Sequence, residues 1–98
     1  MFIGEVIGNV WGTRKHPSMC DKKMLLVRPI DPVTEEPLGD AQLCLENGLG
    51  AGPGSVVLVL DEGGSARMVL KDEAAPVRTI VVGIVDSVIL GGKRKKYD

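Results

Sequence analysis

The chain has 98 residues, of which 44% are hydrophobic and 26% are charged, and this composition is that of one globular domain rather than of a disordered chain. Twelve Lys and Arg against thirteen Asp and Glu give a net charge of −1, so the chain as a whole lacks the basic surplus typical of nucleic-acid binders. A domain of this length buries only roughly 60–65% of the surface that its unfolded chain exposes, so an isolated monomer is expected to be marginally stable.

The first third of the chain is predicted to form two strands around a surface loop. Residues 2–11 are rich in Val and Ile, as strands are, and the two glycines among them, Gly4 and Gly8, indicate a bulge, a bend or a close backbone approach. Residues 13–21 are polar and predict a surface loop. Residues 23–30 predict the second strand.

A short third strand is predicted over residues 41–46. Ala41, Leu43 and Leu45 alternate there with Gln42, Cys44 and Glu46, and a period of two predicts one dry face made by the first three. The glycine-rich residues 47–54 then predict a loop.

The second half of the chain adds two strands and a short helix. Residues 55–60 form a continuous apolar run, short enough for a buried strand, and residues 78–90 predict one long last strand. Between them Ser65 is placed to cap a helix of one or two turns ending at Val69. No segment of eleven or more residues has a helical period, which excludes a doubly wound α/β fold. The fold class is therefore predicted as all-β, a small five-stranded OB-like barrel with one short helix.

The last eight residues differ in charge from the rest of the chain. Without residues 91–98 the chain carries 8 basic and 12 acidic side chains, a net charge of −4. The sequence therefore predicts a domain over residues 1–90 and a basic, flexible C-terminal tail, whose cations are Lys93, Arg94, Lys95 and Lys96.

No feature of the sequence indicates a membrane, a signal peptide or a metal site. No apolar run reaches about 18 residues, and the N-terminus has no basic region or cleavage site, so the chain is expected to be cytosolic. Cys20 and Cys44 are separated by 23 residues and are expected to be small buried or half-buried thiols rather than a disulfide. With a single histidine, His16, they form no zinc spacing, and no cofactor is expected.

The glycine-rich loop admits two interpretations. Converging backbone N–H groups of such loops can bind phosphate when a helix follows. Here a strand follows, Pro53 removes one donor, and no Lys-Ser/Thr pair is present, so a tight loop where backbones approach closely is favoured.

The other polar candidates do not form a catalytic set. His16 lies in a polar loop without an identifiable partner. Asp86 follows an apolar run and either pairs with Arg67 or faces solvent. Single-strand nucleic-acid binding needs aromatic stacking platforms, of which the chain has only Phe2, Trp11 and Tyr97.

Six segments in collinear order resemble the bacterial microcompartment vertex proteins, the EutN/CcmL family. The likeness covers residues 1–90, and the combination of the Gly-Ala-Gly loop with Ser-Ala-Arg about a dozen residues later is specific. The segments are GEVIGNVW (4–11), TRKHPS (13–18), KMLLV (23–27), LGAGPGSVVLV (49–59), GSAR (64–67) and IVVGIVD (80–86).

The resemblance implies a structural protein without catalytic residues. It implies an OB-like barrel that assembles into a homopentamer, which caps the five-fold vertices of a polyhedral shell otherwise tiled by hexameric shell proteins. An OB-type nucleic-acid-binding module is the alternative. Two departures from the family pattern, Asn47 in place of Asp and Ser55 in place of an acidic residue, leave the fold expectation intact.

Small residues would let five copies approach near the axis, so the glycine loop is the expected subunit interface. Its predicted interface residues are Gly50, Ala51, Gly52 and Gly54, and the backbone at Gly50 is expected to have a positive φ. Ser65, Arg67 and Asp86 are the expected structural motif residues.

Overall fold

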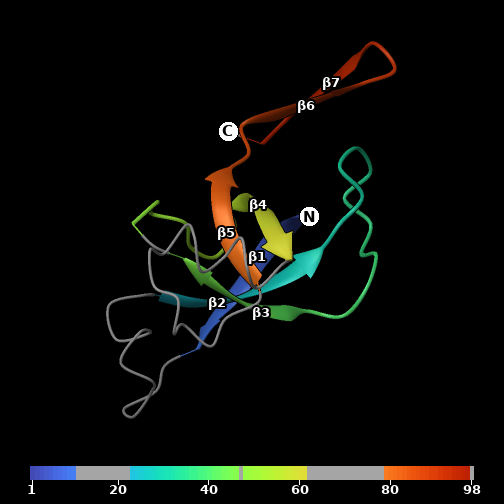
Figure 1. Cartoon of the computed structure of the whole chain (residues 1–98). Coiled ribbons are helices and arrows are strands. Elements are labelled where there is room, and N and C mark those ends of the chain that lie inside the picture. The colour runs from blue at the N-terminus through green and yellow to red at the C-terminus, as the bar shows by residue number, and fades with distance from the viewer. Residues whose placement is uncertain (11–22, 47, 62–78, 98) are drawn as a thin grey trace.

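Five strands close into a barrel in the computed structural model, which describes residues 1–10, 23–46, 48–61 and 79–97 (Figure 1). Their order around the barrel is β1-β2-β3-β5-β4, and all neighbours are antiparallel except the parallel pair β3–β5. The strands are β1 (Phe2–Val10), β2 (Lys23–Pro29), β3 (Gln42–Glu46), β4 (Val56–Asp61) and β5 (Thr79–Ile84).

The closed five-stranded barrel confirms the predicted all-β fold class. The described residues contain no helix, and the short helix predicted over residues 65–69 lies outside them. Accordingly, no helix long and apolar enough to cross a membrane occurs in the part of the chain that the structure describes.

The two glycines of β1 have the roles that the sequence predicts. The register between β1 and β2 shifts between Val6 and Gly8, which places a bulge there. At Gly4 the strands approach so closely that a Cβ atom would lie 2.9 Å from the carbonyl oxygen of Arg28 and would also overlap the side chain of Val27. Gly4 is therefore required by packing.

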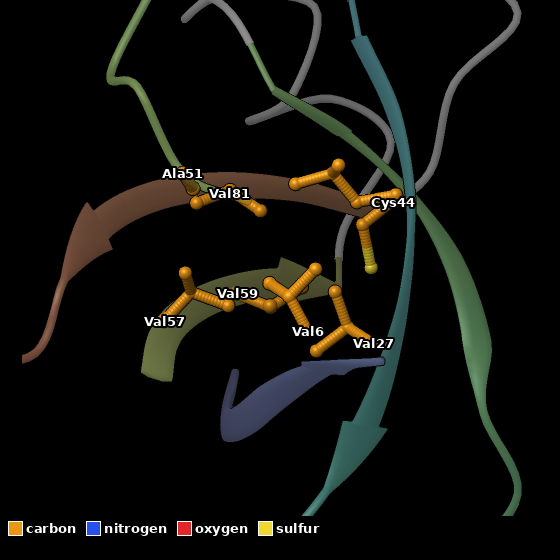
Figure 2. Packing of buried hydrophobic residues seen from close by; sticks show 8 residues of the cluster. Val6, Val27, Cys44, Ala51, Val57, Val59 and Val81 are labelled. Carbon is orange, nitrogen blue, oxygen red and sulfur yellow. The ribbon is translucent and has the colours of Figure 1, made fainter. Parts of the chain in front are cut away.

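Apolar side chains cover both sides of the barrel wall. Successive residues of one strand, such as Met24 and Leu25, enter different clusters because strand side chains alternate between faces. The first cluster, most of which Figure 2 shows, consists of Val6, Leu25, Val27, Cys44, Ala51, Val57, Val59 and Val81. The second contains Met24, Leu45 and Ile80, with Val10, Leu60 and Val82 packed against them.

The dry face predicted for the third strand is wrong. Cys44 lies in the first cluster, whereas Leu43 is exposed and Leu45 belongs to the second cluster. The alternation misleads because apolar residues cover both faces of this strand. Cys44 is a free, buried thiol, as expected, and burial raises its pKa. Cys20 lies outside the described residues.

The long last strand predicted over residues 78–90 is divided in two. β5 ends at Ile84, and β6 (Ser87–Leu90) pairs with β7 (Lys93–Lys96) in a separate two-stranded sheet. The break follows Val85, whose N–H still donates to the carbonyl of Val56 at 2.8 Å before the chain leaves the barrel. The basic residues predicted as a flexible tail thus form a strand, while the domain boundary at residue 90 stays a prediction.

We expect Gly4→Ala to destabilise the protein, because the added Cβ atom collides with the backbone of β2. Overpacking of this kind costs roughly 1–3 kcal/mol, measurable as a lower urea midpoint with unchanged m-value. The matched control is Gly39→Ala, where a Cβ atom would meet nothing within 4 Å. Equal midpoints for the two variants would contradict the close approach at Gly4.

Candidate functional site at the glycine-rich loop

The glycine-rich loop connects β3 to β4 and depends on backbone conformations that favour glycine. Gly48, Gly50 and Gly54 have φ angles of 79°, 81° and 91°. Residues with a Cβ atom are strained there, since the left-handed region brings Cβ close to the following carbonyl. The positive φ expected at Gly50 is confirmed.

A buried carboxylate organises the start of the loop. Glu46, the last residue of β3, is 1% exposed, and its Oε1 accepts hydrogen bonds from the backbone N–H of Leu49 and of Gly50, the latter at 3.2 Å. Lys23 Nζ lies 3.8 Å from the other oxygen, Oε2, and donates to the carbonyl of Ala51 at 3.4 Å. The carboxyl group of Glu46 thus fixes the loop from the barrel side, with Lys23 beside it at the surface.

Sequence reasoning missed Glu46 as a site residue. The alternation of residues 41–46 places it only on the polar side of the strand. Its position directly before a glycine-rich loop is a usable signal, because a carboxylate at a strand end can accept N–H groups of the following turn.

Two further loop amides are also bound within the protein. Gly52 N–H donates to Ser55 Oγ at 3.2 Å, and Gly54 N–H donates to the carbonyl of Val6 at 2.9 Å. Val6 N–H in turn donates to the carbonyl of Ser55 at 2.9 Å. The backbone N–H groups of residues 49, 50, 52 and 54 therefore all donate to protein acceptors. Because a phosphate would need such N–H groups to be free, this favours the tight loop over a phosphate site.

Packing within one subunit does not require glycine at the loop. A Cβ atom added at Gly48, Gly50, Gly52 or Gly54 would meet nothing within 4 Å. Ala51 differs, because its methyl group is fully buried in the first cluster. The space next to the four glycines is therefore unoccupied within the subunit. At Ala51 only the backbone, and not the buried methyl group, is available for the predicted contact with another copy.

Of the remaining predicted residues the structure describes only Asp86, which is not part of the loop. Asp86 is exposed between β5 and β6, and its carbonyl accepts the N–H of Tyr97 at 2.8 Å. Ser65, Arg67 and His16 lie outside the described residues. Within residues 1–10, 23–46, 48–61 and 79–97, no group of three or more His, Cys, Asp or Glu side chains is placed to hold a metal ion.

Comparison with known sequences assigns nearly the whole chain to one family. The family described as "Ethanolamine utilisation protein EutN/carboxysome" matches residues 1–86. The chain is 39% identical over 93 residues to the bacterial microcompartment shell vertex protein EutN of Escherichia coli strain K12, covering 95% of each chain. It is 40% identical over 88 residues to the carboxysome shell vertex protein CcmL of Gloeobacter violaceus, covering 90% of this chain and 85% of the relative.

Solved structures superpose on this chain over nearly its whole length. An ethanolamine utilization protein, EutN, superposes with a TM-score of 0.84 at 38% identity, over 96% of this chain and 95% of that one. The pentameric microcompartment shell protein GrpN from Rhodospirillum rubrum superposes with a TM-score of 0.77 at 34% identity, over 92% of this chain and 99% of that one.

We expect Glu46→Ala to loosen the loop, because it leaves the amides of Leu49 and Gly50 without their acceptor. The two amides lose a part-buried hydrogen bond, so their hydrogen exchange should accelerate relative to the barrel amides. Glu46→Gln keeps one acceptor oxygen and should show a smaller acceleration. Unchanged exchange at both amides in Glu46→Ala would refute the role given to this carboxylate.

Proposed function

The chain belongs to the EutN/CcmL family, and from this premise we propose that it is a structural shell protein whose pentamers cap the five-fold vertices of a polyhedral bacterial microcompartment. The observation that carries the proposal is the similarity along nearly the whole chain to proteins named as shell vertex components. The barrel fold that the chain shares with a pentameric shell protein supports it.

Shell geometry gives this role a physical basis. A surface tiled by hexagons cannot close without pentagonal defects, so a closed shell needs a five-fold component. A ring of five uses one heterologous contact that repeats until it closes. Ring formation also stabilises a small domain, because binding of a partner favours the folded state by mass action.

We place the glycine-rich loop at the five-fold axis. The open space around Gly50, Gly52 and Gly54 on the isolated subunit leaves room for the backbone of a neighbouring copy. Glu46 and Lys23 hold the loop from the barrel side, so its shape is set before assembly. Small residues then serve close approach between copies rather than ligand binding.

The proposed role is structural and requires neither catalysis nor a cofactor. Its partners are further copies of this chain and the hexameric shell proteins of the same compartment, and assembly takes place in the cytoplasm. Asp86 and the two motif residues outside the described part of the chain, Ser65 and Arg67, are assigned structural roles in this proposal.

The purified protein should be a pentamer of about 52 kDa, five times the 10.4 kDa of one chain. Native mass spectrometry at micromolar concentration measures this directly. Gly52→Val should shift the population toward monomers, because the added side chain enters the space between copies. Gly52 suits this test since it lacks the positive φ that would strain Gly50→Val within the subunit.

Gly39→Val is the control for the loop variant, because Gly39 is equally unhindered and lies outside the loop. Both variants should retain the circular dichroism of the barrel. A wild-type monomer would overturn the vertex role, whereas a Gly52→Val pentamer as stable as the control would overturn only the placement of the loop at the axis.

One observation favours the alternative of an OB-type nucleic-acid-binding module, namely the row of basic residues in β7. The described residues include only two aromatic side chains, Phe2 and Tyr97, neither of which is fully exposed, so stacking platforms are scarce.

We therefore expect weak binding of single-stranded DNA at physiological salt, measured by fluorescence anisotropy. The residual binding should disappear when Lys93, Arg94 and Lys96 are replaced with Gln, because phosphate contacts supply it. Submicromolar binding that survives this replacement would support the alternative function.

A further inference from the structure

The β6–β7 hairpin is an arm that stands outside the barrel. The two strands pair antiparallel from Ser87↔Lys96 to Leu90↔Lys93 and form a sheet of their own. The φ angles of Gly91 and Gly92, 59° and 78°, are those of a tight hairpin turn with two left-handed positions. Figure 1 shows the hairpin projecting away from the five barrel strands, with the turn at its far end.

Four contacts gather at the base of this arm, and two of them, Tyr97–Pro32 and Lys95–Glu35, fix it against the β2–β3 connection. Tyr97 donates its N–H to the carbonyl of Asp86 at 2.8 Å and its hydroxyl to the carbonyl of Pro32 at 2.6 Å. Lys95 Nζ lies 2.8 Å from Glu35 Oε2, and its ammonium group is 5.8 Å from the centre of the Tyr97 ring. We call this set the clasp.

The surroundings of Lys95 and Tyr97 raise the pKa values of both side chains. The hydrogen bond to Glu35 raises the pKa of Lys95, so the cation is favoured. Burial raises the pKa of the Tyr97 hydroxyl, which stays protonated and able to donate. The direction of the arm relative to the barrel is therefore set by contacts within the subunit.

Beyond the clasp the arm is uncovered. Ile89 is 72% exposed and Leu90 is 60% exposed. Lys93, Arg94 and Lys96 are exposed too and form no ion pair with any other described residue. A two-stranded ribbon is at best marginally stable in water, and Ile89 and Leu90 leave one large aliphatic side chain exposed on each of its faces. Such exposed apolar side chains typically indicate contact surfaces. The exposed apolar and basic residues in the far half of the arm thus indicate a surface that contacts another molecule.

The charge distribution indicates what that partner is. The arm carries four basic side chains, whereas residues 1–90 carry a net charge of −4. Outside its own arm, a second copy of this chain therefore carries a net charge opposite to that of the arm. A heterologous ring contact also needs two different surfaces on each subunit, and the arm and the remainder of the subunit are two such surfaces.

We infer that the arm is the segment by which each copy holds the next one in the ring. Ile89 and Leu90, which lie on opposite faces of the ribbon, both become covered in the contact between copies, and the clasp presets the direction of the arm. This inference rests on the pentamer proposed above. It adds the residues that join adjacent copies, at a place separate from the glycine-rich loop.

The test compares two substitutions of equal chemistry and similar exposure. Leu90→Ser lies on the arm, and Leu38→Ser replaces a leucine that is 65% exposed in the β2–β3 connection. Native mass spectrometry over a dilution series gives the concentration at which each variant dissociates. We expect Leu90→Ser to require at least tenfold more protein than the wild type to remain pentameric, and Leu38→Ser to behave as the wild type.

Two further variants separate the arm from its clasp and from folding. Ile89→Ser should act as Leu90→Ser does, and Tyr97→Phe should weaken the ring by loosening the arm while leaving its apolar residues in place. Barrel circular dichroism should be unchanged in all of them. The wild-type ring should dissociate at higher protein concentrations when salt is added, because salt screens the charges of the arm.

The outcomes distinguish the inference from the proposed function. If the wild type is pentameric and both arm variants match Leu38→Ser, the arm does not join the copies and the inference fails. If the wild type is itself monomeric at micromolar concentration, the proposed pentamer fails.

Discussion

Closure of the barrel between β3 and β5 is the constraint on which the rest of the structure depends. The two strands are parallel, with Leu45 opposite Ile80, and they are far apart in the sequence. The hydroxyl of Thr79 donates to the carbonyl of Leu43 across the same seam at 2.5 Å. With the seam closed, the valine-rich first cluster is sealed from water, and an exposed sheet edge is avoided.

The same two strands lead into both proposed contact surfaces. β3 ends in Glu46, whose carboxylate shapes the glycine-rich loop, and β5 ends two residues before the arm begins. Loop and arm therefore start from strands that closure holds at fixed positions. Each is then secured locally, the loop by Glu46 and Lys23 and the arm by Tyr97 and Lys95. In a ring of five, the same subunit contact occurs five times, so a misplaced loop or arm would weaken all five contacts. Local fixation of the loop and of the arm prevents this.

Much of the fold was predictable because the sequence marks it locally. Runs of Val and Ile bounded by glycine predicted the barrel strands, and Gly4 and Gly8 predicted the close approach and the bulge in β1. The dry face of β3 was mispredicted, because apolar residues cover both sides of the wall and alternation alone cannot tell inside from outside. The division of the last strand was missed, because Val85 and Asp86 interrupt the apolar run too weakly to be recognised as a break.

The loop shows where sequence reasoning about a site succeeds and fails. A positive φ at Gly50 was predictable, because glycine density in a loop without a following helix has few other causes. The place of Glu46 at a strand end before the loop hints at its role, but only the structure shows which amides its carboxylate reaches. The clasp joins Tyr97 to Pro32, 65 residues apart, and contacts at such separation are set only by the closed barrel.

The most direct measurement of the central claim is an electron-microscopy reconstruction of the purified wild-type assembly, calculated without imposed symmetry. We expect five copies in one ring, with the glycine-rich loops facing the axis and each arm lying on the adjacent barrel. A ring of another order, or one whose glycine-rich loops lie on the outer rim, would contradict this account.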